Sequence, residues 1–259
     1  MKDLVLITGA STGIGYEMAK ILAERKFDLV LVARTADKLE YLKQEFTAAH
    51  AINVRIIVKD LSKPENAVQL YEHIKSEGLE VTMLVNNAGM GVYGDFVETP
   101  LSTELQMIGL NISSLVTLTK LFGHDMRQKG YGRIMNVASL LSFLPFPYYS
   151  VYSATKAFVL AFSETVAAEL EGTGVIVTAL CPGPVDTQFT TTEMLKTNAY
   201  KTNKPIHPSI VAKAGVDLLT KGKGKKIVGF TNWIISNLPR VMPDFFMMKI
   251  KKKLAKPTN

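Results

Sequence analysis

A glycine-rich turn near the start of the chain constrains the fold more than any other feature. The turn, Gly9 to Gly15, follows a short apolar stretch from Asp3 to Thr8 and precedes a helical pattern from Tyr16 to Arg25. A short apolar run of this kind is typical of a parallel strand that is buried on both faces. The first part of the chain therefore predicts a strand, a tight turn and a helix in succession.

The same turn is a candidate anion site. At the start of a helix, free backbone N–H groups and the helix dipole attract an anion such as a pyrophosphate, and glycines let the backbone approach it. Glycines also form ordinary tight turns, but the position between the first strand and the first helix favours the anion site. Its candidate residues are Gly9, Ser11, Thr12, Gly13, Ile14 and Gly15.

Strand-like and helix-like patterns alternate through the rest of the chain, which is typical of an α/β fold. Strands are expected at 28–33, 54–58, 83–85, 132–139, 175–180 and 226–230, and helices at 36–49, 101–129, 152–170 and 209–221. No internal repeat or linker divides the chain, so residues 1–259 are expected to form a single domain. Residues 188–220 are expected to include a substrate loop or lid, because 188–207 lacks clear periodicity.

Positive charge is concentrated at the C-terminal end. The chain carries a net charge of +7, but residues 221–259 hold ten Lys and Arg against one acid, Asp244, and so carry +9. The other 220 residues therefore sum to −2. A near-neutral body with a basic tail is not typical of a nucleic-acid-binding protein, and no aromatic residue interrupts the lysine run. We expect no nucleic-acid partner.

The second expected strand ends at Ala33 and Arg34, where many dinucleotide-binding folds place an acid that bonds the adenosine ribose hydroxyls. Neither residue is acidic, and the Arg34 guanidinium suits a 2′-phosphate. This charge favours NADP(H) over NAD(H). The alternative is a solvated surface arginine.

Polar residues also follow the next two strands. Asp60, beside Leu61, can accept a hydrogen bond from an adenine amino group, or it can cap the helix that begins near Pro64. The stretch from Asn86 to Gly89 places asparagines and small residues where they can bond backbone and ribose. Such residues are also common in turns.

A second stretch carries groups that can move a proton. Ser139 ends an expected strand, and Tyr152 and Lys156 lie four residues apart on one face of a helix. A lysine cation beside a tyrosine favours the phenolate and lowers its pKa from about 10. Ser139 can hold a substrate oxygen against that phenol, so the stretch predicts a proton-transfer site. Asn111 is a further candidate, because Gly109 weakens the long helix and favours a local kink.

Several other functions are not expected. The histidines (His50, His73, His124 and His207) are not spaced as metal ligands from one another or from Cys181, so no metal site is predicted. The Gly-x-Ser-x-Gly elbow of serine hydrolases is absent from the sequence.

The sequence also bears on the cellular compartment. A single cysteine agrees with a reducing compartment. The N-terminus lacks signal-peptide features, and no uninterrupted apolar run reaches the roughly 18 residues that cross a bilayer, so a cytoplasmic protein is expected.

With these motifs in this order, the chain resembles the short-chain dehydrogenase/reductase family over roughly residues 3 to 190. The motifs are Thr8-Gly-Ala-Ser-Thr-Gly-Ile-Gly15, Asn86-Asn-Ala-Gly89, Asn111, Ser139, Tyr152-Ser-Ala-Thr-Lys156, and Pro182-Gly183 with Thr187. The resemblance implies a single Rossmann-type doubly wound domain of about seven parallel strands flanked by helices. It also implies an enzyme that interconverts carbonyl and alcohol groups. The subgroup of the family that carries Ala33-Arg34 with this glycine motif usually prefers NADP(H). One departure is Ser114, where many members carry glycine, and we expect it to affect packing only.

The resemblance further implies roles for individual residues. Tyr152 would be the acid in reduction and the base in oxidation, and Lys156 would bond the nicotinamide ribose and lower the pKa of Tyr152. Ser139 would orient the substrate carbonyl, and Asn111 would hold a water in the proton relay. The other implied cofactor contacts are Asp60 with Leu61 at the adenine, Asn87, Ala88 and Gly89 at the adenosine ribose, and Pro182, Gly183, Val185 and Thr187 at the nicotinamide.

The substrate is less constrained than the chemistry. Apolar residues from Leu140 to Tyr149 follow Ser139, and those from Met90 to Tyr93 are expected to face them. Such a lining favours an apolar ketone or aldehyde, unless half of these residues belong to the core. Neither Tyr148 nor Tyr149 has a lysine four residues on, so both are expected to line the substrate pocket.

The C-terminal tail, 231–259, mixes bulky apolar residues with a lysine run. As a helix it would place Phe246, Met247, Ile250 and Leu254 on one side. Such a segment can lie on an anionic membrane or cap the substrate pocket, and the alternative is a solvated charge run with intersubunit packing. The second candidate function is therefore a membrane-associated or scaffold protein that keeps the fold without turnover.

An oligomer is also expected. The resemblance implies a homodimer or homotetramer that packs through the helix after Tyr152. One face of that helix, from Ala154 to Ala168, is small and apolar and suits packing against either the sheet or a second subunit.

Overall fold

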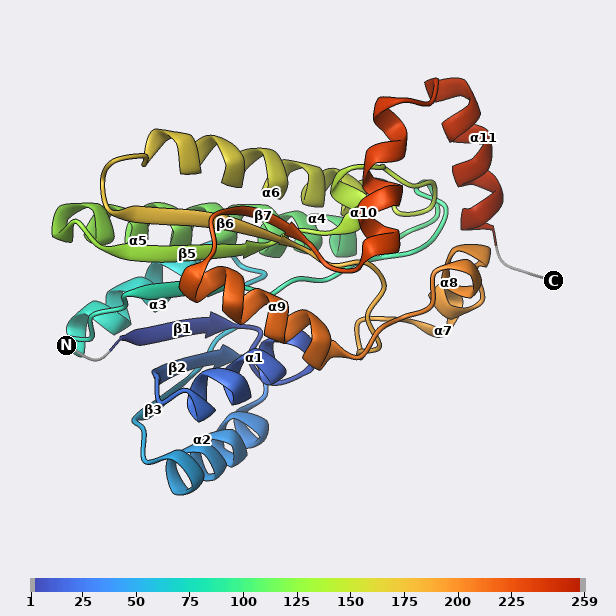
Figure 1. Cartoon of the computed structure of the whole chain (residues 1–259). Coiled ribbons are helices and arrows are strands. Elements are labelled where there is room, and N and C mark those ends of the chain that lie inside the picture. Colours follow the sequence, from blue (N-terminus) through green and yellow to red (C-terminus); the bar gives the residue numbers. More distant parts are fainter. Residues whose placement is uncertain (1–2, 257–259) are drawn as a thin grey trace.

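Seven parallel strands form one sheet at the centre of the protein (Figure 1). The computed structural model describes residues 3–256. The strands are β1 (Leu4–Thr8), β2 (Asp28–Ala33), β3 (Val54–Val58), β4 (Met83–Asn86), β5 (Gly132–Val137), β6 (Val175–Cys181) and β7 (Gly224–Ile227). They pair in the order β3-β2-β1-β4-β5-β6-β7, so the strand order reverses beside β1. In open parallel sheets, ligands bind at the carboxyl ends of the strands beside such a reversal.

Helices cover both faces of the sheet, which confirms the doubly wound α/β architecture (Figure 1). One face carries α1 (Gly13–Glu24), α2 (Ala36–His50) and α9 (Pro208–Lys221), and the other carries α3 (Glu65–Ser76), α5 (Leu115–Lys129) and α6 (Ser150–Glu169). Along β2, Leu29 and Leu31 enter one apolar cluster, while Val30 and Val32 enter the other. Successive side chains of a strand point to opposite faces, so a strand covered on both faces is mostly apolar along its length.

A group of short elements lies beyond the carboxyl ends of the strands (Figure 1). They are α7 (Thr192–Leu195), α8 (Asn198–Thr202), α10 (Phe230–Asn237), η3 (Leu238–Arg240) and α11 (Asp244–Ala255). The short turn η2 (Leu140–Ser142) connects β5 to the segment before α6. The segment 188–207 and the C-terminal tail therefore meet near the edge of the sheet where a ligand is expected.

The long helix expected over 101–129 is interrupted at its centre. It consists of α4 (Leu101–Ile108), a π-helical turn η1 (Gly109–Ser114) and α5. A Cβ on Gly109 would collide with the carbonyl oxygen of Ser62. Glycine therefore lets the helix approach the loop after β3, and the predicted kink at Gly109 and Asn111 is confirmed as a π-helical turn.

This long helix is apolar and long enough, by composition and length, to cross a membrane. Polar and charged residues interrupt it, so it contains no uninterrupted apolar run of that length. The core helix of a globular fold passes the same test, and Leu118, Phe122 and Met126 of α5 are buried against the sheet. Length and composition therefore do not show that this helix spans a membrane.

The last strand differs from the expectation. It covers Gly224–Ile227 instead of 226–230, and Phe230 is the first residue of α10. Lys225 and Lys226 are exposed, as charged side chains commonly are on an edge strand. The apolar run that predicted a strand over 226–230 is broken at Gly229, the residue before α10. The φ of Gly229 is 95°, a value that favours glycine.

Candidate active site

A cavity of about 670 Å³ lies at the carboxyl ends of the strands. It extends from Arg34 and Asp60 at one end, past the glycine turn, to Tyr152 at the other. The predicted site residues that line it are Gly9, Ser11, Thr12, Gly13, Ile14, Arg34, Asp60, Leu61, Asn87, Ala88, Gly89, Ser139, Tyr152, Lys156, Pro182, Gly183, Val185 and Thr187. Gly15 and Asn111 are buried behind this lining.

The glycine turn and the start of α1 form a cradle whose shape is fixed by close backbone contacts. Gly9 has a φ of 65°, in the region that favours glycine. A Cβ on Gly15 would collide with the carbonyl oxygen of Gly9, so the helix start approaches the turn only without a side chain. Asn87 Nδ2 donates to the carbonyl oxygens of Thr8 and Gly9 at 3.0 and 3.1 Å. The residues present fit the pyrophosphate of a dinucleotide.

Arg34 and Asp60 follow neighbouring strands and line the same end of the cavity. Asp60 Oδ1 accepts a hydrogen bond from Ser62 N at 3.0 Å, so Asp60 shapes the turn before α3. Burial raises the pKa of Asp60, but the hydrogen bonds from Ser62 and the Arg34 and Lys63 cations lower it below its ordinary value. The adenine contact of Asp60 stays a prediction.

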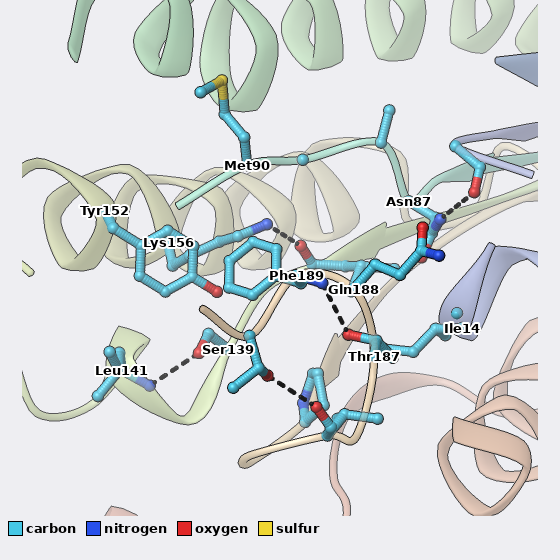
Figure 2. Close-up of a pocket in the computed structure, with 18 of the residues that line it drawn as sticks. Ile14, Asn87, Met90, Ser139, Leu141, Tyr152, Lys156, Thr187, Gln188 and Phe189 are labelled. Carbon is cyan, nitrogen blue, oxygen red and sulfur yellow. Dashed lines mark hydrogen bonds between the residues drawn. The ribbon is translucent and has the colours of Figure 1, made fainter. Parts of the chain in front are cut away.

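Tyr152, Lys156 and Ser139 converge at the opposite end of the cavity (Figure 2). Their exposed fractions are 9%, 5% and 7%. Lys156 Nζ donates to the carbonyl oxygen of Val137 at 2.8 Å and lies 6.0 Å from the centroid of the Tyr152 ring. The four-residue spacing on α6 therefore puts the phenol and the amine side by side, as predicted.

The Ser139 hydroxyl is oriented by the backbone after β5. Ser139 Oγ accepts a hydrogen bond from Leu141 N at 3.1 Å, which makes Ser139 the N-cap of η2. Ser142 Oγ donates to the carbonyl oxygen of Lys156 at 2.7 Å and so ties η2 to α6. Because Ser139 Oγ accepts from the backbone, its own proton can be donated to an oxygen beside Tyr152.

Burial controls the pKa values of the two titratable groups. Burial raises the pKa of Tyr152 to about 12, although a hydrogen bond with Ser139 lowers it. Burial also lowers the pKa of Lys156 to about 8. The expectation that Lys156 lowers the pKa of Tyr152 is not met in this structure, because burial outweighs any effect of the cation. The phenol is therefore protonated at neutral pH, as a general acid has to be.

Asn111 holds the loop after β4 in place. Its Oδ1 accepts from Met90 N at 3.0 Å, and its Nδ2 donates to Met90 O at 2.9 Å and to Thr155 Oγ1 at 3.1 Å. A Cβ on Gly89 would lie 3.3 Å from Asn111 Oδ1 and 3.4 Å from Lys156 Nζ, so these residues meet closely. The amide of Asn111 is occupied by protein partners, and its role in holding a water stays a prediction.

Ser114 has a packing role, as expected. Its hydroxyl is buried and donates to the carbonyl oxygen of Leu61 at 2.6 Å. The bond fastens the π-helical turn to the loop after β3. A glycine at this position would leave that carbonyl without this partner.

The cavity also contains residues that sequence reasoning did not identify. The ring of Phe189 packs against the Tyr152 ring, with centroids 5.4 Å apart (Figure 2). Others come from elements far along the chain: Tyr200 of α8, Ile235 of α10 and Leu254 of α11. Phe189 and Tyr200 are aromatic residues in the segment 188–207, which lacks periodicity. Aromatic residues in such a segment are the sequence signal that could have identified them as pocket residues. Tyr148, expected in the pocket, does not line it, whereas Tyr149 does.

The C-terminal helix α11 packs against the elements around the cavity. Tyr93 Oη donates to the carbonyl oxygen of Ala255 at 2.7 Å, and Asn198 N of α8 donates to the carbonyl oxygen of Lys256 at 3.3 Å. The expected face of this helix is wrong in part. Met247 and Leu254 lie inward, but Phe246 and Ile250 are 58% and 45% exposed. Because the inner face is set by contact with α8 and the loop after β4, hydrophobicity alone did not identify it.

The face of α6 that runs from Ala154 to Ala168 is largely exposed. Ala154, Phe158 and Ala161 are exposed, whereas Phe162 packs against a cluster that includes Ala179 and Cys181 of β6, so only part of this face packs on the sheet. The buried face of α6 instead carries Tyr152 and Lys156. Within residues 3–256, no group of three or more His, Cys, Asp or Glu side chains is arranged to hold a metal ion.

Comparisons with known proteins agree with this geometry. The family model of the short-chain dehydrogenases matches residues 3–198. The chain is 32% identical over 257 residues to the very-long-chain 3-oxoacyl-CoA reductase of Anas platyrhynchos, covering 96% of this chain and 80% of that one. It is 39% identical over 204 residues to the 17-beta-hydroxysteroid dehydrogenase type 3 of Homo sapiens, covering 76% of this chain and 63% of that one. The match thus spans less than two thirds of the human relative.

A solved structure is similar over nearly the whole chain. The short-chain dehydrogenase from Sphingobium yanoikuyae in complex with NADPH superimposes with a TM-score of 0.80 and 28% identity, covering 92% of this chain and 93% of that one. The chain therefore belongs to the short-chain dehydrogenase/reductase family. It is an oxidoreductase of the class that acts on CH–OH and C=O groups with a nicotinamide cofactor.

Proposed function

We propose that the protein is an NADP(H)-dependent reductase of apolar ketones or aldehydes. The observation that carries this proposal is the convergence of Tyr152, Ser139 and Lys156 in a cavity whose other end is lined by Arg34. The cavity wall beside Tyr152 contains Leu144 and other apolar residues, which favours an apolar substrate. The two relatives described above are named a very-long-chain 3-oxoacyl-CoA reductase and a 17-beta-hydroxysteroid dehydrogenase, and the long acyl chain and the steroid skeleton in those names are hydrocarbon.

The proposed roles of the chain's residues follow from their positions. The reduced nicotinamide, when bound, supplies a hydride. Ser139 donates a hydrogen bond to the substrate oxygen and holds it beside the phenol of Tyr152. Tyr152 gives its proton to that oxygen as negative charge develops there, and Lys156 provides a cation nearby. The reverse reaction uses the same groups, with the phenolate as the base.

Arg34 is proposed to select the cofactor. Its guanidinium lies at the end of β2, where an adenosine ribose is held in this fold class, and a 2′-phosphate there makes charge-assisted hydrogen bonds. Ser11 to Ile14 would hold the pyrophosphate, and Thr187 would face the nicotinamide.

A panel of ketones and aldehydes assayed with NADPH and with NADH tests the proposed function. Turnover of apolar carbonyls with NADPH supports it, and a protein inactive on the whole panel would contradict it.

The reductive rate is expected to fall in mildly alkaline solution. The pKa of Lys156 is lowered to about 8 by burial, so the cation is present below that pH and is lost as the pH rises through it. The pKa of Tyr152, at about 12, lies too high to account for such a change. We expect kcat/KM for reduction to be constant near pH 6–7 and to decline around pH 8. A profile that stays flat to pH 10 would show that the Lys156 cation is not required.

A second candidate function, contact with a membrane surface, is favoured by the outward face of the C-terminal helices. Phe245, Phe246 and Met248 of α11 are 63%, 58% and 53% exposed. On α10, Phe230 and Trp233 stack on each other with ring centroids 6.0 Å apart and are also exposed. The exposed cations beside them are Arg240, Lys249, Lys252, Lys253 and Lys256. Bulky apolar residues flanked by lysines are typical of segments that lie on anionic membranes.

Replacing Phe245 and Phe246 together with serine is expected to abolish binding to vesicles that contain phosphatidylserine, because these side chains supply much of the exposed apolar area. The measurement is co-sedimentation, with pure phosphatidylcholine vesicles as the uncharged comparison. Tyr41→Ser, at a 65% exposed tyrosine of α2, is the matched control and should bind as the native chain does. Self-association that is lost in the double variant, without vesicle binding, would assign this face to a second copy instead.

Assembly and location are proposed on separate grounds. The exposed apolar face of α6 supports a homodimer or homotetramer that packs through this helix. The single buried Cys181 agrees with a reducing, cytoplasmic location, with peripheral membrane contact through the C-terminal helices. The substrate partner is a small carbonyl or alcohol.

A further inference from the structure

Tyr149 carries a buried hydroxyl that the proposed chemistry does not use. The residue is the N-cap of α6, lines the cavity and is 6% exposed. Among residues 3–256, its Oη has no hydrogen-bond partner. A buried hydroxyl without a partner loses its bonds to water and gains none in return, so such groups call for an explanation.

The other tyrosines around this hydroxyl each have a polar group beside them. Burial raises the pKa of Tyr149, and the phenols of Tyr200, Tyr93 and Tyr152 lie near enough to raise it further. Tyr93 Oη donates to the carbonyl oxygen of Ala255, and the Thr190 and Ser139 hydroxyls lie near enough to Tyr200 and Tyr152 to oppose the rise in their pKa values. Tyr149 is the tyrosine of this group whose buried hydroxyl has no hydrogen-bond partner among the described residues.

The surroundings specify what this hydroxyl can bind. The Tyr149 and Tyr152 rings have centroids 6.3 Å apart, and both belong to the start of α6. The remaining lining near Tyr149 is hydrocarbon, including Leu144, Phe146 and Leu254. A ligand whose reacting carbonyl lies at Tyr152 can thus present a second oxygen to Tyr149 only if that oxygen is a few bonds away from the reacting carbonyl. The rest of the ligand meets an apolar wall.

We propose that Tyr149 Oη donates a hydrogen bond to a second carbonyl oxygen of the substrate, two carbons from the carbonyl that is reduced. The substrate class is then a 3-oxoacyl ester or thioester with an apolar chain, and Tyr149 distinguishes it from a simple ketone. The inference rests on the proposed function, because it takes Tyr152 as the group at the reacting carbonyl. A site built to bond a substrate oxygen rejects an analogue that lacks it, since the buried donor is then left unpaired.

The test compares Tyr149→Phe with the native chain on ethyl 3-oxooctanoate and 3-octanone, with NADPH. The ratio of kcat/KM for the ester to kcat/KM for the ketone is expected to fall about tenfold in the variant, the size of one hydrogen bond. Tyr148→Phe is the matched control: its side chain does not line the cavity, and the ratio should match that of the native chain.

A second readout needs neither cofactor nor turnover. Because the Tyr149 hydroxyl makes no bond within the described protein, Tyr149→Phe should melt at or above the temperature of the native chain. A clear drop in melting temperature would show a structural bond and overturn the proposal. So would an unchanged ester-to-ketone ratio, or a native chain that prefers the ketone. A native chain inactive on both compounds and on the wider carbonyl panel would instead overturn the proposed function itself.

Discussion

Tyr152→Phe is expected to lower carbonyl reduction by about 10²- to 10⁴-fold, the contribution of general acid catalysis, while NADPH binding stays close to that of the native chain. Phenylalanine keeps the ring that packs against Phe189 and Tyr149 but has no proton to give. The measurement pairs steady-state rates of carbonyl reduction with a fluorescence titration of bound NADPH. The loss should fall on kcat, because the proton moves only in the transition state.

Tyr149→Phe and Tyr148→Phe serve as matched controls for this variant, because each removes a neighbouring phenol from the same segment. Neither is expected to lower ketone reduction as Tyr152→Phe does. Turnover retained in Tyr152→Phe would remove Tyr152 from the acid role. Loss of NADPH binding together with turnover would assign the phenol to the cofactor pocket and leave the acid unidentified.

Arg34→Ala is expected to raise the KM for NADPH about 10- to 100-fold and to leave the KM for NADH within about twofold. Hydrogen bonds to a charged group contribute about 1.5–3 kcal/mol, and each 1.4 kcal/mol is a tenfold change in affinity. The 2′-phosphate is absent from NADH, so removing the guanidinium removes a contact that only NADPH makes. Steady-state kinetics with both cofactors and one carbonyl substrate measure the effect.

The control for this variant is Arg25→Ala. Arg25 forms a surface ion pair with Asp217 at 2.8 Å and does not line the cavity. Its loss should leave both KM values unchanged. If Arg34→Ala also leaves the KM for NADPH unchanged, Arg34 is a solvated surface residue and cofactor selection lies elsewhere.

The parts of the protein that the sequence predicted well depend on local rules. Uninterrupted apolar runs such as Leu29 to Val32 predicted the buried strands, because a strand covered on both faces carries few polar side chains. The spacing of Tyr152 and Lys156 predicted that both lie on one face of α6. Gly15 was identified from the glycine-rich turn between the first strand and the first helix, and the structure adds that a Cβ there would collide with the carbonyl oxygen of Gly9.

The parts that were missed depend on contacts between distant segments. Phe189, Tyr200, Ile235 and Leu254 reach one cavity from the loop after β6 and from three helices, and no spacing along the chain links them. The inner face of α11 was predicted in part wrongly because it is set by contact with α8. The pKa of Tyr152 was expected to be lowered by Lys156, whereas burial raises it, and burial is not visible in a motif.

The most direct test of the central claim is the fate of a hydride. NADPH carrying deuterium at the transferable position of nicotinamide C4 is incubated with the native chain and an apolar ketone, and the alcohol is examined by mass spectrometry. We expect one deuterium on the former carbonyl carbon with the native chain, and about 10²- to 10⁴-fold less of the same deuterated alcohol with Tyr152→Phe. Nicotinamide C4 carries two hydrogens, so NADPH labelled at each of them in turn is used. If the alcohol forms without deuterium from both preparations, hydride transfer from the cofactor is contradicted.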